Sequence, residues 1–201
     1  MQIIGLTGGY CAGKNEVARI LEKYGWEVVD VDKLGHAALL QVSDQLIKIF
    51  GESIKKEDGT IDRKRLGTIV FSDKNRLDAL EATVHPAILS LLNEEIEKAK
   101  HNTVEKFCIN AALLYRFPQT HLCNAVIEVR APLYQRILRA QRRDHLSINA
   151  ALERIKSQKY LWDMRPKEGV PIYMLWNSGS SAELKISTEA LLNKIAASGG
   201  K

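Results

Sequence analysis

The sequence has few of the residues that build disulfide frameworks, zinc sites or nucleic-acid surfaces. Its three cysteines, Cys11, Cys108 and Cys123, form no C-x-x-C pair, which excludes a disulfide scaffold and a cysteine-bound zinc. The five histidines are too scattered to form a metal-binding motif. Aromatic residues make up only 6% of the chain and do not alternate with basic ones, so we expect no base-stacking surface for a nucleic acid.

Long hydrophobic runs are also absent. No segment approaches the roughly 18 consecutive apolar residues that a membrane-spanning helix needs. Residues 1–5 lack the basic region and the cleavage site of a secretory signal, and we interpret them as part of a first strand. We therefore expect a cytoplasmic protein without a membrane or nucleic-acid partner, and we expect it to be a monomer.

The length and the order of apolar segments predict the fold class. A chain of 201 residues is long enough for one well-buried domain with modest insertions. Its net charge of +5 suits an anionic ligand, for which a small phosphorylated molecule is the simplest candidate. Short apolar segments alternate with helical ones, which predicts a parallel sheet with helices on both faces. The predicted strands are residues 1–6, 27–32, 107–114, 125–129 and 173–176.

Helical patterns occupy the rest of the chain. Apolar residues from Val17 to Tyr24 recur at helical spacing, and Gly25 is placed where a C-cap glycine belongs. Residues 34–100 form a long helical insertion between the second and third strands. Within it, Pro86 is expected to open a helix, because proline is favoured at the first helical position.

The C-terminal third contains two further helical regions. Residues 132–160 are predicted to be helical and are unusually basic. Ser180 and Glu183 have the spacing of a capping box, which predicts a last helix near residues 181–197. The tail, residues 198–201, is expected to fray.

A phosphate-binding loop is the strongest functional signal. Residues 8–15 match G-x-x-x-x-G-K, except that Asn15 stands where the motif has a hydroxyl residue. A strand precedes the loop and a helix follows it, so backbone N–H groups can surround phosphate oxygens while Lys14 reaches the β- and γ-phosphates. The alternative is a glycine-rich turn without a ligand. The predicted ATP-binding residues are Gly8, Gly9, Tyr10, Cys11, Ala12, Gly13, Lys14, Asn15 and Glu16.

Further motifs extend over nearly the whole chain. V-V-D-V-D spans residues 28–32 and D-G-x-x-D-R spans residues 58–63, and they are followed by H-P at 85–86 and N-S-G at 177–179. Together with the phosphate loop, this combination resembles the dephospho-CoA kinase family. The resemblance implies transfer of the ATP γ-phosphate to the ribose 3′-hydroxyl of dephospho-CoA, the final step of coenzyme A biosynthesis, with Mg²⁺ as cofactor.

The same resemblance implies a domain plan. A three-layer P-loop core with a parallel sheet would comprise residues 1–32, 101–131 and 166–201. Residues 33–100 would form a helical domain that binds dephospho-CoA, and residues 132–165 would form a helical lid.

Four residues are predicted to be catalytic: Lys14, Asp32, Arg139 and Arg143. Asp32 follows the second strand and matches the general base proposed for the family, and with Asn15 it is predicted to support the metal. From the residues alone, Asp32 is as readily an N-cap of the next helix. Arg139 and Arg143 are four residues apart and share a helix face, so they either clamp phosphate or form a solvated basic face.

The remaining predicted contacts involve both substrates. Asn177 and Gly179 are expected to bind the nucleotide, with the Asn177 amide reading the adenine edge, although a plain turn is the alternative. By resemblance, His85, Leu114 and Arg116, together with Asp32, are predicted to contact dephospho-CoA. For the His85-Pro86 pair the alternative is merely a helix start.

The chain also departs from the family pattern. Asn15 replaces a metal-binding hydroxyl residue, and Asn110 and Arg116 stand where many members of the family have acidic residues. Two other hypotheses therefore remain beside dephospho-CoA kinase. One is a P-loop kinase for another acceptor, such as a nucleoside monophosphate. The other is a nucleotide-binding protein that has lost catalysis.

Overall fold

The computed structural model describes residues 1–198. It divides into two compact units, which are treated separately. The first comprises Met1–Val29 and the chain from Asn102 onward, and the second comprises Asp30–His101. Among the described helices, none is both long and apolar enough to cross a membrane. Apart from Ser198, the tail that was expected to fray lies outside the described residues.

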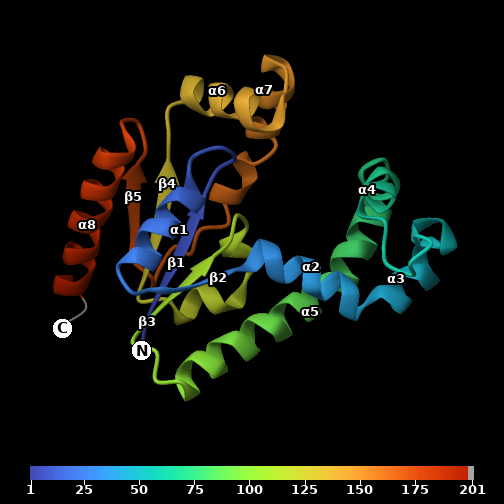
Figure 1. Cartoon of the computed structure of the whole chain (residues 1–201), viewed down its shortest axis with the longest axis horizontal. Helices are drawn as coiled ribbons and strands as arrows, with labels where there is room; N and C mark the ends of the chain where they lie inside the picture. The colour runs from blue at the N-terminus through green and yellow to red at the C-terminus, as the bar shows by residue number, and fades with distance from the viewer. Residues whose placement is uncertain (199–201) are drawn as a thin grey trace. The chain divides into compact units, whose positions relative to one another are not determined.

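A five-stranded sheet forms the centre of the first unit, in the order β2-β3-β1-β4-β5 (Figure 1). β1 pairs in parallel with β3 and β4, and β4 pairs in parallel with β5, which confirms the predicted α/β class. Because β1 is the middle strand, the loop that follows it opens at the centre of the sheet edge. The strands are β1 (Gln2–Gly8), β2 (Glu27–Asp30), β3 (Lys106–Asn110), β4 (Ala125–Arg130) and β5 (Ile172–Trp176).

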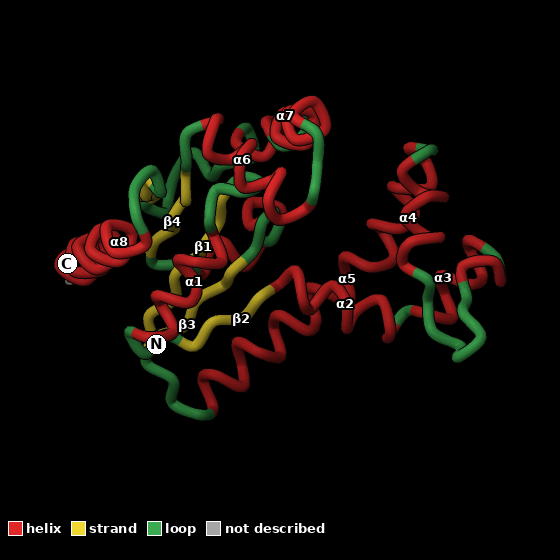
Figure 2. The backbone as a smooth tube through the Cα atoms, turned by 45° about the horizontal axis from the view of Figure 1, so that its top comes forward, coloured by secondary structure: helices red, strands yellow, loops and turns green. Residues whose placement is uncertain are grey.

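One face of the sheet is covered by α1 (Lys14–Lys23) and α8 (Ser181–Ser198). Successive strand residues point to opposite faces, so Ile4 and Leu6 lie on the same side, and both are fully buried in the core with these helices. Figure 2 shows the strands side by side, with the two helices packed against them.

Short 3₁₀ turns lie on the opposite face of the sheet. They are η2 (Leu114–Arg116) and η3 (Pro118–Leu122). Gly5 leaves room for Leu114, because a Cβ at Gly5 would lie 2.6 Å from the Leu114 Cδ2 atom. A larger residue at this position would displace Leu114 from a fully buried site.

Two local signals in the sequence have the predicted structure. Gly25 follows α1 with a φ of 80°, and its N–H donates to the Glu22 carbonyl at 3.0 Å. At the start of α8, the Ser180 N–H donates to the Glu183 carboxylate at 2.6 Å, and the Glu183 N–H donates to the Ser180 hydroxyl at 3.2 Å. The C-cap glycine and the capping box are therefore both confirmed.

The segment predicted as a lid contains α6 (Leu133–Asp144), α7 (Ile148–Lys156) and η4 (Lys159–Trp162). It belongs to the first unit. Figure 1 shows α6 and α7 beyond the end of the sheet at which β1 passes into its loop. The basic helical segment therefore lies beside the phosphate loop.

The second unit is helical and has its own apolar core. Ala38, Leu46 and Ile54 are fully buried at its centre. α5 contacts α2, α3 and α4, so the longest helix organises the unit. Its elements are α2 (Val31–Gln41), α3 (Ser43–Phe50), η1 (Glu52–Ile54), α4 (Arg63–Phe71) and α5 (Lys74–His101).

Three predicted boundaries are wrong. β2 ends at Asp30, because the Asp30 carboxylate accepts from the backbone N–H of Asp32 and so starts a helix there. The strand predicted over residues 107–114 is too long, because β3 ends at Asn110 and Leu114 turns into the core beside Gly5. An apolar run in the sequence does not distinguish a buried strand from a buried turn.

The third error concerns Pro86, which lies inside α5 and does not open a helix. An internal proline costs a helix about 3 kcal/mol through the lost hydrogen bond and steric clash. Val84, before the proline, and Leu92, after it, are both buried. Packing on both sides of the proline keeps the helix continuous.

Candidate active site

The phosphate loop has the geometry of an anion cradle. β1 ends at Gly8, the Ala12 N–H donates to the Gly9 carbonyl at 2.9 Å, and α1 begins at Lys14. Gly13 has a φ of 100°, and a Cβ there would collide with the side-chain amide of Asn177. A residue other than glycine would thus strain the backbone and displace a buried neighbour. The loop delivers the first N–H groups of α1 to a bound anion.

Lys14 is held inside the site by Asn110. Its side chain is largely buried, and the ammonium donates to the Asn110 Oδ1 atom at 2.7 Å. Asn110 ends β3, and its register partner on β1 is Leu6, so the amide lies next to the loop. A neutral amide orients the ammonium without neutralising it. The bond to Asn110 therefore fixes the position of the ammonium beside the loop.

Two arginines of α6 contact the carbonyl groups of the phosphate loop. The Arg136 Nε atom donates to the Tyr10 carbonyl at 2.8 Å, and Arg139 donates to the Ala12 carbonyl at 3.2 Å. The loop can orient its N–H groups toward an anion because these guanidinium groups hold its carbonyls. Arg136 was missed in the sequence, although it lies three residues before Arg139 on the same helix face.

Arg143 lies one helical turn beyond Arg139 and reaches the loop differently. Its guanidinium carbon is 5.2 Å from the centroid of the Tyr10 ring. The same guanidinium donates to the Asp144 carboxylate, at 3.0 Å through Nε and at 2.8 Å through Nη2. The structure therefore brings Arg139 and Arg143 to the phosphate loop, and their role on phosphate stays a prediction.

Asn177 supports the loop from the end of β5. Its amide nitrogen donates to the Ala12 carbonyl at 3.0 Å, and its amide oxygen accepts from Arg139 at 3.3 Å. It is buried, so it is more than a plain turn residue. A contact with adenine stays a prediction. Gly179 lies beside Glu183 of the capping box, with which a Cβ would clash.

The predicted substrate contacts lie in both units. In the first, Leu114 is fully buried against Gly5, so its side chain is not exposed to a ligand in this conformation. Arg116 lies in η2 and is half-buried. In the second, His85 lies in the middle of α5, half-buried, so the helix-start alternative for His85-Pro86 is wrong.

Asp32 lies in the second unit, in the first turn of α2, and is exposed. The N-cap of α2 is Asp30, whose carboxylate accepts from the backbone N–H of Asp32 at 3.0 Å and of Lys33 at 3.4 Å. The helix-capping alternative for Asp32 is therefore wrong. Its carboxylate is therefore not the cap of α2, and its catalytic role stays a prediction.

The comparisons with known proteins identify the family. A family model described as dephospho-CoA kinase matches residues 2–183. The chain belongs to the dephospho-CoA kinase family. A dephospho-CoA kinase of Geobacter sulfurreducens is 34% identical over 197 residues, which cover 96% of this chain and 98% of that protein.

Solved structures agree with this membership. A protein of Thermus thermophilus has a TM-score of 0.79 and 32% identity, covering 96% of this chain and 97% of that one. A dephospho-CoA kinase from Campylobacter jejuni has a TM-score of 0.65 and 25% identity over the same shares. The predicted P-loop kinase fold is thereby confirmed.

Mg²⁺ was predicted as the cofactor, and the donors near Lys14 can be tested for it. Within the described part of the chain, no group of three or more histidine, cysteine, aspartate or glutamate side chains is placed to hold a metal ion. Mg²⁺ needs fewer protein donors, because it keeps several waters and binds substrate phosphates. Asn15 is exposed in the first turn of α1, where an amide oxygen can join such a shell. Asn15 therefore fits a Mg²⁺ ion whose other ligands are mainly nucleotide phosphates and waters.

A buried carboxylate on β4, Glu128, was not found from the sequence. It is fully buried and accepts hydrogen bonds from Tyr115 at 2.6 Å, from Arg130 at 2.9 Å and from Arg165. Burial alone would raise the pKa of Glu128, but the bonds from Arg165, Tyr115 and Arg130 outweigh it and lower that pKa. Arg165 is the last residue of the predicted lid, so Glu128 anchors the end of that segment to the sheet.

We expect Glu128→Gln to lower the free energy of unfolding by about 2–3 kcal/mol, because it leaves two partly buried guanidinium groups without their carboxylate. For a chain of this size that corresponds to a Tm lower by about 5–10 °C, measurable by calorimetry. Glu189→Gln is the matched control, since Glu189 accepts from Tyr24 at an exposed site. Its effect should stay within about 0.5 kcal/mol.

The pH dependence gives a second check. Folding lowers the pKa of Glu128, so its contribution is present above the ordinary glutamate pKa of about 4.3 and is lost as the pH falls below it. The stabilities of wild type and Glu128→Gln should converge on acidification. Equal stability of the two proteins at neutral pH would contradict an anchoring role.

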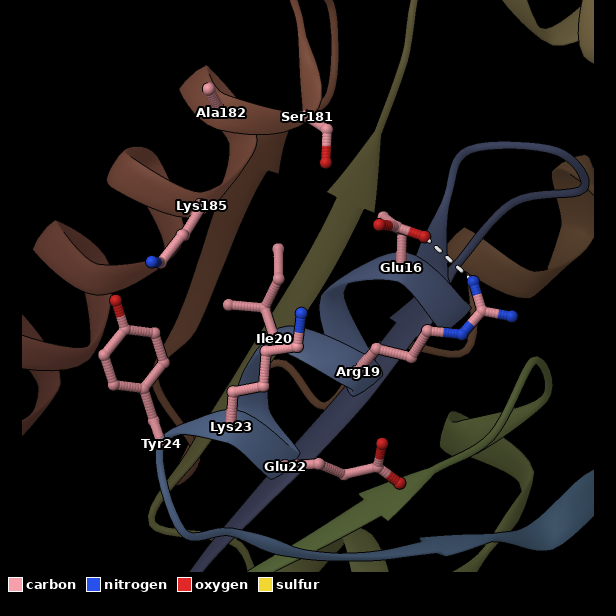
Figure 3. Close-up of a pocket in the computed structure, with 9 residues that line it drawn as sticks. All are labelled: Glu16, Arg19, Ile20, Glu22, Lys23, Tyr24, Ser181, Ala182 and Lys185. Carbon is pink, nitrogen blue, oxygen red and sulfur yellow. Dashed lines mark hydrogen bonds and ion pairs between the residues drawn. The ribbon is translucent and has the colours of Figure 1, made fainter.

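A groove between α1 and α8 lies apart from the phosphate loop. Its volume is about 520 Å³, and Figure 3 shows Ile20 at its centre with Lys185 and Tyr24 at one side. Glu16 is its only predicted ATP-binding residue, and the figure shows that side chain paired with Arg19 at the rim. Residues that line this groove, such as Lys23 and Tyr24, lie away from the phosphate loop and are suitable control positions for substitutions in the loop.

Proposed function

We propose that this chain is a dephospho-CoA kinase, which transfers the γ-phosphate of ATP to the ribose 3′-hydroxyl of dephospho-CoA. The observation that carries the proposal is the buried Lys14, held by Asn110 beside a complete anion cradle. This machinery occurs in a chain whose match to the family model extends from residue 2 to residue 183. ATP and dephospho-CoA are its substrates and partners.

Residues of the first unit bind and orient the nucleotide. The N–H groups of the loop and the N-terminus of α1 hold the phosphates, and Lys14 neutralises the charge that develops at the β/γ bridge. Asn177 and Arg139 keep the loop in this shape through the Ala12 carbonyl. Asn15 and Asp32 would hold Mg²⁺, which would supply further neutralisation of phosphate charge.

The acceptor side of the reaction is assigned to the second unit. Asp32 takes the proton of the 3′-hydroxyl as that oxygen attacks. Residues 33–100, which include His85, bind dephospho-CoA, and residues 132–165 act as a lid. The protein works as a cytoplasmic monomer, with neither nucleic acid nor membrane as a partner.

One assay tests the proposal. The purified protein is incubated with Mg²⁺, ATP and dephospho-CoA, and in parallel with a panel of nucleoside monophosphates, and the products are identified by mass spectrometry. We expect coenzyme A and ADP in the first reaction and no phosphorylated product in the others. Product from a nucleoside monophosphate alone would favour a kinase with another acceptor.

A second function is favoured by specific substitutions. In the family pattern a hydroxyl residue stands at position 15, and acids stand at positions 110 and 116. This chain has Asn15, Asn110 and Arg116 there, so a hydroxyl and a negative charge are lost and a second negative charge is replaced by a positive one. A chain that binds ATP but transfers no phosphate to any acceptor would be a nucleotide sensor. ATP binding measured by calorimetry, without turnover in the assay above, would establish this alternative.

Asn15 decides between these two functions. We expect Asn15→Ser to change kcat and the Mg²⁺ requirement only modestly, because both side chains offer an oxygen to the metal or to one of its waters. Asn15→Leu offers none and should raise the Mg²⁺ concentration for half-maximal rate about tenfold or more. The measurements are kcat against free Mg²⁺, and ATP affinity with and without Mg²⁺.

The opposite result would overturn the proposed activity of the native chain. If wild type makes no coenzyme A at saturating Mg²⁺ while Asn15→Ser restores turnover, the native loop is degenerate. The nucleotide-sensor function would then replace the kinase function.

A further inference from the structure

Tyr10 lies inside the phosphate loop, yet its side chain contacts the lid. Two guanidinium groups lie over its ring, with the Arg143 carbon 5.2 Å and the Arg154 carbon 5.1 Å from the ring centroid. The hydroxyl donates to the Asp144 carboxylate and accepts from Arg154 at 3.4 Å. A single loop residue thus contacts α6, through Arg143 and Asp144, and α7, through Arg154.

The Tyr10 backbone is tied to the same segment. Its N–H donates to the Gln158 Oε1 atom at 2.6 Å, just beyond α7, and its carbonyl accepts from the Arg136 Nε atom at 2.8 Å, in the first half of α6. The lid is therefore attached to the loop at its beginning, middle and end. These three attachments are made by Tyr10, and Arg139 adds a bond to the Ala12 carbonyl.

The charges around the ring suit an anionic ligand. Two guanidinium groups and one carboxylate leave a net charge of +1 at this point, next to N–H groups that bind phosphate. Hydrogen bonds from Arg143 and Tyr10 lower the pKa of Asp144 to about 2, so the carboxylate that organises the cluster stays ionised. The ring itself carries no charge.

We propose that Tyr10 is a positioning residue, which docks the lid on the phosphate loop and so places Arg143 and Arg154 beside the nucleotide phosphates. This inference rests on the proposed kinase function. Tyr10 itself takes no part in phosphoryl transfer and acts through the two arginines. A face of the ring orients each guanidinium group, and the hydroxyl fixes Asp144, which in turn holds Arg143.

A series of substitutions separates the ring from the hydroxyl. Tyr10→Phe keeps the cation–π contacts and removes the bond to Asp144, and we expect the KM for ATP to rise by a few-fold. Tyr10→Leu removes both, and we expect a rise of about tenfold or more with a fall in kcat of similar size. A merely space-filling role would leave Tyr10→Phe at the wild-type KM, because phenylalanine has nearly the volume of tyrosine.

A double-mutant cycle tests the link to the anchor. Asp144→Asn combined with Tyr10→Phe should cost less than the sum of the two single changes, because both remove the same hydrogen bond. Tyr24→Phe is the matched control. It removes a tyrosine hydroxyl bonded to a carboxylate, Glu189, away from the lid, and its kinetics should equal those of wild type.

The docking of the lid on the phosphate loop is also measured without turnover. Hydrogen exchange of residues 133–158 in the nucleotide-free protein should be faster in Tyr10→Leu than in wild type or Tyr24→Phe. If Tyr10→Leu has wild-type KM, kcat and exchange in this segment, the positioning role is wrong while the kinase function stands. If wild type makes no coenzyme A, the kinase function fails, and the exchange experiment together with ATP affinity still decides whether Tyr10 docks the lid.

Discussion

Lys14→Ala should reduce kcat by about 10³-fold, the loss expected when a positioned charge that stabilises the transition state is removed. In phosphoryl transfer the protein contributes mainly position and charge, and Lys14 is the loop's only cationic side chain. Its ammonium is already oriented by Asn110 at 2.7 Å, so little reorganisation precedes the reaction. Initial rates at saturating ATP and dephospho-CoA measure the effect.

The control for this change is Lys23→Ala, a lysine at the other end of α1 that lines the groove away from the loop. Its kcat should stay within about twofold of wild type, as for surface changes remote from a site. The bond to Asn110 is worth about 1 kcal/mol, and the Tm of Lys14→Ala shows whether the variant remains folded. Near-normal turnover by folded Lys14→Ala would rule out the phosphate-loop assignment.

Asp32→Asn should lower kcat by roughly 10²-fold or more and leave the ATP affinity within a few-fold. The amide has nearly the shape of the carboxylate but does not accept the proton of the attacking hydroxyl. Since Asp30 caps α2, the substitution also leaves the start of that helix intact. The two readouts are kcat at saturating substrates and the ATP dissociation constant from calorimetry.

The control is Asp73→Asn in the same unit. The Asp73 carboxylate accepts from the backbone N–H of Asn75, as Asp30 accepts from that of Asp32, and asparagine caps helices about equally well. Its kcat should match that of wild type. If Asp32→Asn instead lowers the Tm and keeps kcat, the role of Asp32 is structural.

Local sequence rules predicted the structure correctly where all the interacting residues lie a few positions apart in the chain. The capping box of α8, the glycine after α1 and the phosphate loop each depend on hydrogen bonds between residues a few positions apart. Alternating apolar and helical segments likewise predicted the parallel sheet. The same rules misplaced Pro86, because packing on both sides of it outweighs the local preference for a break.

Contacts between distant segments required the tertiary structure. Lys14 and Asn110 are 96 residues apart and meet only because β1 and β3 pair. Glu128 looks like an ordinary strand residue until β4 brings it to Tyr115 and Arg165. Asn110 was seen in the sequence as a departure from the family, but its partner was not.

The sequence by itself determined that this chain has a phosphate loop, an α/β fold and the motifs of its family, because each is written in local order and spacing. Only the tertiary structure decided which side chains support that loop. Asn110 orients Lys14, Asn177 holds Ala12, and Tyr10 joins the loop to arginines of α6 and α7. These pairings arise from strand register and helix packing, through which residues 96 to 165 positions apart come within hydrogen-bond distance.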